Sequence, residues 1–153
     1  MEEVIGQLLG VLDEAFEHPQ KPWTYFTDNS ADAGFFGTLA KLSTAEASRP
    51  SGGTSIAAHV HHVVFGLVVS SAWIQGHRRR RDWQESWRVS TVDDAAWSRL
   101  QEQLRNECKN LRQVIESHAS SGIEAFGGAL AAIAHVAYHL GAVRQKAVFS
   151  QKS

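Results

Sequence analysis

A long apolar run near the C-terminus constrains the fold of this chain more than any other feature. Over residues 123–143 the only polar side chains are those of Glu124, His135, Tyr138 and His139. Such a run predicts a helix that is buried over most of its circumference. His135 and His139 are four residues apart, so both imidazoles project from one face of this helix, where buried ring nitrogens need partners.

The composition is that of an ordinary globular domain. The chain has 153 residues, of which 43% are apolar and 20% charged, and this predicts a single domain over residues 1–153 with its own core. The net charge of −1 gives no general attraction to nucleic acid. Cys108 is the only cysteine, which excludes an internal disulfide and fits a reducing compartment. The acidic start lacks a secretory signal, so we expect a cytoplasmic protein.

The apolar run also approaches the length of a membrane span. Its paired histidines and its many glycines and alanines argue against that role. A second apolar segment that could pack against it in a bilayer is not evident in the sequence. We therefore expect no association with a membrane.

Helical periodicity recurs along the whole chain, and no alternation typical of strands persists. Long helices are predicted at residues 2–17, 54–76, 93–118 and 123–143, with a short helix at 33–42 and a capped turn that begins at Ser43. The fold class is therefore all-α. We predict a four-helix bundle with one long connection, between the first and second long helices.

Three features outside the last helix have both a structural and a functional interpretation. Cys108 lies on the apolar seam of residues 93–118, which favours a structural role over a nucleophile, and His118 ends that seam as a predicted C-terminal cap. The aromatic loop at 18–32 is expected to fold back onto the domain, with a pocket lid as the alternative. The run of four arginines at 78–81 is typical of a solvated helix end, with an anion site as the alternative.

The predicted helix at 54–76 supplies a candidate third metal ligand. A zinc or nickel site with an open position needs three protein ligands, and His135 and His139 provide two. His61 points away from His59 and His62 on a helical wheel. The wheel slightly prefers His59, which lies nearer the apolar stripe, so the residues alone leave the choice between His59 and His62 open. The alternative to a metal site is a set of core histidines that hydrogen-bond to neighbouring groups.

Several motifs together resemble those of the DinB/YfiT-like superfamily. They cover nearly the whole chain: Leu42–Ser48, Thr54–His62, Asp82-Trp83, Ser86-Trp87 and Ala134–Gln145. The resemblance implies an up-down-down-up four-helix bundle that binds a divalent metal, commonly zinc or nickel, through three histidines. Carried over, these ligands are His62, His135 and His139. The chain departs from the superfamily pattern at Phe65, where an Asp is frequent, and at Ala142, where a Gln is common.

The function that the resemblance implies is that of a metal-dependent enzyme. Such a site activates water or a low-molecular-weight thiol, so the chain is expected to be a hydrolase or a thiol transferase acting on a small-molecule substrate. A homodimer is also expected. Tyr138 and Arg144 are candidates for orienting the substrate, and no acid stands out as a general base. The alternative is a non-catalytic module that binds a metal or a small ligand.

Overall fold

The computed structural model describes residues 1–150 and confirms the all-α class. Six α-helices and two 3-10 turns are present in this part of the chain, and its only β pairing is an isolated bridge between Ser51 and Thr54. The elements are α1 (Glu2–Phe16), α2 (Phe35–Ala40), α3 (Thr44–Ser48), α4 (Ile56–Ile74), η1 (Trp83–Trp87), α5 (Asp94–His118), η2 (Ala119–Ser121) and α6 (Ile123–Ser150).

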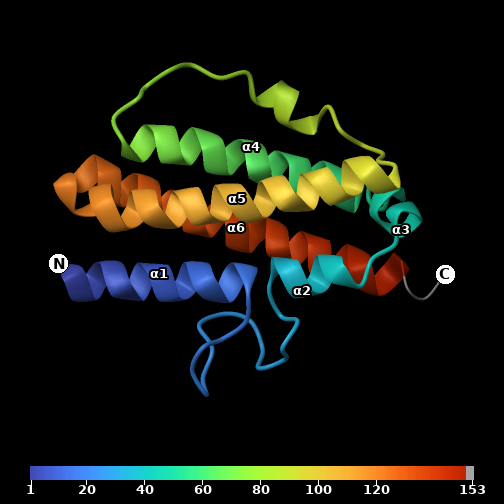
Figure 1. The fold of residues 1–153 in the computed structure, drawn as a ribbon, viewed down its shortest axis with the longest axis horizontal. Coiled ribbons are helices and arrows are strands. Elements are labelled where there is room, and N and C mark those ends of the chain that lie inside the picture. The colour runs from blue at the N-terminus through green and yellow to red at the C-terminus, as the bar shows by residue number, and fades with distance from the viewer. Residues whose placement is uncertain (151–153) are drawn as a thin grey trace.

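The four long helices lie alongside one another (Figure 1). Helices α1 and α6 run in one direction, and α4 and α5 run in the opposite direction. The short helix α2 continues the line of α1 along one edge. The α4 helix packs against both α5 and α6, whereas α1 packs against α6 and α5. This arrangement places the first histidine-bearing helix, α4, directly against the second, α6.

Side-chain caps fix where the central helices begin. The Ser55 side chain accepts a hydrogen bond from the Ala58 backbone at the start of α4, and Asp93 caps α5 in the same way. Ser43 and Glu46 form the predicted capping box at the start of α3. At the other end of α4, Gly76 has a φ of +88°, a left-handed conformation that glycine adopts without strain. These caps fix the position of the α4 histidines along the helix axis.

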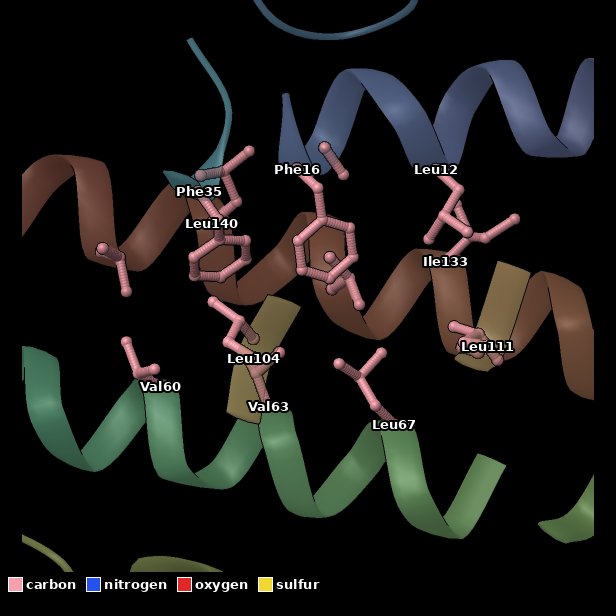
Figure 2. Close-up of a cluster of buried hydrophobic side chains, with 14 of the residues drawn as sticks. Leu12, Phe16, Phe35, Val60, Val63, Leu67, Leu104, Leu111, Ile133 and Leu140 are labelled. Atoms are coloured by element: carbon pink, nitrogen blue, oxygen red, sulfur yellow. The ribbon is translucent and has the colours of Figure 1, made fainter. Parts of the chain in front are cut away.

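One apolar core joins all four long helices (Figure 2). Its wholly buried members include Leu12, Phe16, Val60, Val63, Leu67, Leu104, Leu111 and Leu140. Each such side chain contributes about 1.5–3 kcal/mol through removal from water. Helical spacing predicts one apolar stripe for α4, and all its members are buried: Ile56, Val60, Val63, Leu67 and Ile74. In α6 the helical wheel groups Leu130 with Ile133 and Leu140 on the apolar side, and this prediction is wrong for Leu130. Leu130 is 52% exposed, because α6 turns Ala129, Ala132 and Val136 toward its neighbours instead.

The chain has two long connections where the sequence predicted one. Residues 17–55 join α1 to α4 and contain α2 and α3, as expected. Residues 75–93 form a second long connection, which crosses α4 and includes η1 (Figure 1). The second connection is needed because α4 and α5 run parallel, so the chain must return along the length of α4 before α5 begins.

Helices α4 and α6 are both long and apolar enough to cross a membrane, judged by length and composition alone. Both contain a window of mean hydropathy 1.4, so the expectation that the chain has no second apolar segment was wrong. The core helices of soluble proteins meet the same criterion, and α4 and α6 pack against each other in the core. Their apolarity is therefore weak evidence for a membrane span.

Candidate metal centre

Three histidines from two helices meet where α4 packs against α6. His62 of α4 and His135 and His139 of α6 each offer one ring nitrogen, and these three atoms lie within 4.8 Å of one another. The Nε2 atoms of His62 and His135 are 2.9 Å apart. Because zinc binds imidazole nitrogen at about 2.0–2.1 Å, ligand atoms this close can reach a single ion. We refer to these three residues as the histidine trio.

A glycine makes room for the trio on α4. Gly66 lies one turn after His62, and a Cβ atom added there would lie 2.6 Å from Cε1 of His135. Any larger residue would therefore push the His135 ring out of its position. Gly66 was not predicted as part of the site, although an isolated glycine within a helical pattern is a recognised sign of close packing.

The 75–93 connection fixes the proton position on His62. Ser86, a wholly buried residue of η1, donates its hydroxyl hydrogen to the backbone carbonyl of Trp83. The same oxygen lies 2.6 Å from Nδ1 of His62. Since a hydroxyl has only one hydrogen to donate, Ser86 must accept from Nδ1–H of His62. This tautomer leaves Nε2 of His62 unprotonated, with its lone pair directed at the 2.9 Å contact with Nε2 of His135.

Tryptophans of η1 cover one side of the trio. The Trp87 ring stacks on the His62 ring, with centroids 4.1 Å apart and planes 18° from parallel. Trp83 lies 5.7 Å from the His62 ring and 6.1 Å from the His135 ring, centroid to centroid. His61 points away from the trio, as predicted, and its Nδ1 lies 2.6 Å from the Ser86 carbonyl oxygen. The indoles thus exclude water from the face of the trio that η1 covers.

His59, the alternative ligand, lies beside the trio and contacts one of its members. Its Nδ1 is 2.9 Å from Nδ1 of His139, and its Nε2 is 3.0 Å from the Thr54 hydroxyl. Two proton arrangements satisfy this chain of groups. In one of them His139 donates from Nδ1 to His59, and His59 donates from Nε2 to Thr54, so that Nε2 of His139 remains unprotonated.

The surroundings favour the neutral form of every imidazole in the cluster. Burial, followed by the neighbouring histidines, lowers the pKa of His62 to about 4 and that of His139 to about 3. Burial also lowers the pKa of His135, and burial together with Lys146 lowers that of His59. Neutral imidazole is the form that binds a metal ion. The cluster is therefore in its ligating form at neutral pH without any bound cation.

The other candidate residues lie outside the trio. Tyr138 is 75% exposed, and its ring centroid lies 5.2 Å from that of His139. Arg144 is half-buried and forms an ion pair with Asp28 of the loop after α1. Phe65 packs its ring against that of Trp83, with centroids 5.3 Å apart. Ala142 is half-buried and carries no polar group.

The apolar seam of α5 shows no sign of chemistry. Cys108 is half-buried, and burial with the carboxylates of Asp13 and Glu17 raises the pKa of its thiol to about 12. A thiol of that kind is a poor nucleophile, consistent with the predicted structural role. His118 ends α5, but its Nδ1 is buried without a hydrogen-bond partner among the described residues. The predicted capping bond is thus not made through this atom.

Comparison with known proteins identifies no relative of this chain. None of the protein-family models, curated proteins or solved structures that were compared with the chain matches it. The likeness to the DinB/YfiT-like superfamily therefore depends on the motif residues alone. The chemistry of the site has to be argued from the histidine trio and its neighbours.

Proposed function

We propose that this chain is a metal-dependent enzyme of the DinB/YfiT-like type, with His62, His135 and His139 as the ligands of one divalent ion. The observation that carries the proposal is the convergence of three neutral ring nitrogens within 4.8 Å. The opposed directions of α1 and α6 relative to α4 and α5 are those of an up-down-down-up four-helix bundle, which supports the same assignment.

The residues around the trio fit a metal ion. Ser86 leaves Nε2 of His62 unprotonated, and the His59–Thr54 chain can do the same for His139. Outer hydrogen bonds of this kind orient histidine ligands in metal sites and set their tautomers. A donor set of imidazole nitrogens suits zinc or nickel.

The proposed reaction is a hydrolysis or the transfer of a low-molecular-weight thiol onto a small-molecule substrate. A divalent ion held by three ligands keeps a position open and lowers the pKa of a bound water or thiol. The chain's own residues would shield the site through Trp83 and Trp87. Tyr138, which lies exposed beside His139, is the side chain best placed to contact a substrate that enters from solvent. Arg144 would act only after release from Asp28.

A non-catalytic metal-binding module is the second candidate, and one observation favours it. The group of potential ligands in the described residues contains no carboxylate, and Phe65 replaces the frequent acid of the superfamily. A hydrolase commonly uses a carboxylate or a histidine as general base. In a module that only binds metal, the hydrogen bonds that Ser86 and His59 make with the ligands would serve metal affinity and not catalysis.

The packing of the two most apolar helices bears on where the protein resides. We propose a cytoplasmic protein that forms a homodimer and does not associate with membranes. The packing of α4 and α6 within one core supports a soluble state.

Elemental analysis of protein purified without a nickel column tests the proposal. We expect about one equivalent of zinc or nickel per chain, and its loss in His139→Ala. Zinc titration into chelator-treated protein, followed by calorimetry, should give a stoichiometry of one. If wild-type protein neither retains nor takes up a divalent ion, both the enzyme and the module are excluded. A survey of thiol and ester substrates with metal-loaded protein then separates these two candidates.

A further inference from the structure

A pocket beside the histidine trio is lined by three of the four arginines of the run at 78–81. This surface pocket, about 450 Å³ in volume, is lined by Arg79, Arg80 and Arg81 together with Trp73 and Trp83. We call it the arginine pocket. We propose that it binds a small molecule that carries a phosphate or carboxylate group on an apolar or aromatic body. We further infer, resting on the proposed function, that this molecule is the substrate of the metal site.

The charges of the arginine pocket are not neutralised by the protein. Arg78, just outside it, pairs with Glu124 and stacks on Trp73. Within residues 1–150, by contrast, no ion pair involves Arg79, Arg80 or Arg81, and no acidic residue lines the pocket. The nearby Asp82 carboxylate accepts a hydrogen bond from the Gln84 backbone. Guanidinium groups bind phosphate and carboxylate through paired hydrogen bonds, so an anion would relieve the repulsion among three adjacent charges.

The tryptophans give the arginine pocket an apolar wall. Trp73 and Trp83 are each 45% exposed, which is unusual for such large apolar side chains. A Cβ atom at Gly128 would lie 2.9 Å from Cδ1 of Trp73, so this glycine lets the indole rest directly on α6. An aromatic or apolar ligand body would cover the indoles and remove their surface from water.

The arginine pocket and the histidine trio are both formed by α4 and α6, and Trp83 lies beside both. Trp83 lines the pocket and also lies 6.1 Å from the His135 ring, between centroids. Ala131 of the pocket floor is one turn before His135 on α6, a distance of about 6 Å along the helix axis. A ligand whose anionic end meets the arginines can therefore extend along α6 to the trio.

The size of the arginine pocket favours a small molecule over a nucleic acid. Small-molecule sites typically have volumes of about 300–1,000 Å³, and this pocket falls within that range. Binding of a nucleic-acid strand normally requires a long basic groove, whereas the chain as a whole has a net charge of −1.

Titration calorimetry with chelator-treated protein tests the inference without any contribution from a metal. The probes are phenyl phosphate, inorganic phosphate and phenol. We expect phenyl phosphate to bind more tightly than either of the others. Arg79→Gln/Arg81→Gln should weaken its binding by about tenfold or more, whereas the control Arg99→Gln/Lys109→Gln, which removes two exposed charges from α5, should not change it. Trp73→Ala should weaken phenyl phosphate binding and leave that of inorganic phosphate unchanged.

Three results would overturn the inference. They are equal binding by the two double variants, binding of phenol as tight as that of phenyl phosphate, and binding of a single-stranded oligonucleotide in place of phenyl phosphate. Thermal melts of each variant verify that it is folded. If phenyl phosphate binds but the wild-type protein takes up no metal, the proposed function fails while the anion site stands. If metal binds but phenyl phosphate does not, only the anion site fails.

Discussion

Two connections lie on opposite sides of the molecule (Figure 1). Both carry exposed tryptophans, but they are held by different means. Residues 17–34, after α1, are held by Glu14, whose carboxylate accepts hydrogen bonds from the backbones of Tyr25, Phe26 and Thr27. Residues 75–93 are held by His61 and His62, whose rings hydrogen-bond to Ser86.

The two anchors differ in whether they retain an atom that can still accept a hydrogen bond or bind a metal ion. Glu14 is 2% exposed, and four donors, including the Thr27 hydroxyl, use up its accepting capacity. The His62 ring uses only Nδ1 on Ser86 and keeps Nε2 for the trio. We infer that the first connection is purely structural, whereas the second holds a ligand in its reactive tautomer.

Glu14→Gln should have the largest effect on stability. The amide removes the charge and places a donor against backbone N–H groups, so we expect a loss of about 3 kcal/mol in the free energy of unfolding. Urea denaturation measures this loss. The zinc-dependent stabilisation should be unchanged, because Glu14 does not contact the trio. A loss of zinc binding in this variant would contradict a purely structural role for residues 17–34.

Removing a trio ligand should have the next largest effect. Zinc at one hundred times its dissociation constant stabilises a folded protein by about 2.7 kcal/mol. His139→Ala should lose most of this increment, which thermal melts with and without zinc will measure. His59→Ala should retain a weakened increment, since His59 contacts His139 from outside the trio. If His59→Ala loses the zinc effect and His62→Ala keeps it, the ligand assignment is wrong.

The buried imidazoles predict how stability depends on pH. An unfolded histidine takes up a proton near pH 6.5, whereas the folded pKa values of His62 and His139 are about 4 and about 3. The unfolded state therefore binds protons first, and metal-free protein should lose stability as the pH falls below about 6.5. His62 and His139 stay neutral in the folded state at pH 5.5, so the zinc-dependent increment should persist there. Histidines with unperturbed pKa values would instead lose the zinc-dependent stabilisation as the pH falls through about 6.5. Thermal melts with and without zinc, at pH 7.5 and at pH 5.5, test whether the zinc-dependent stabilisation persists.

The sequence predicted the elements of this fold better than their surroundings. The four long helices, the capping box at Ser43 and the apolar stripe of α4 follow from periodicity and local hydrogen bonding, which a single sequence displays. The exposure of Leu130 could not be predicted in this way, because it depends on which face of a uniformly apolar α6 its neighbours cover.

The three histidines of the trio could likewise be proposed from the sequence, whereas the residues that support them could not. The spacing of His135 and His139 places both on one helix face, and motif resemblance selected His62. Ser86 and Gly66 act across the fold, on His62 and on His135 respectively, and no local pattern links either to a histidine. The grouping of His62, and not His59, with His135 and His139 depends on how α4 packs against α6, which a helical wheel does not contain.

Ser86→Ala should weaken metal binding without removing a ligand. Loss of the hydroxyl frees His62 to adopt the other tautomer, and outer partners of this kind are worth about 10–100-fold in metal affinity. Calorimetric titration with zinc measures the change. Ser90→Ala is the matched control, because Ser90 lies exposed in the same connection. Equal zinc affinity in Ser86→Ala and wild-type protein would mean that the second connection, like the first, is only structural.

His61→Ala should have the smallest effect and separates two explanations for the loss expected in Ser86→Ala. His61 anchors the same connection through the Ser86 carbonyl, but it contributes no nitrogen to the trio. Its removal should lower the free energy of unfolding by about 1 kcal/mol, the value of one hydrogen bond, and change zinc affinity by less than about threefold. Urea denaturation and zinc titration of one preparation give both numbers. If His61→Ala weakens zinc binding as much as Ser86→Ala does, the connection acts by holding its position over α4. If only Ser86→Ala does so, it acts through the tautomer of His62.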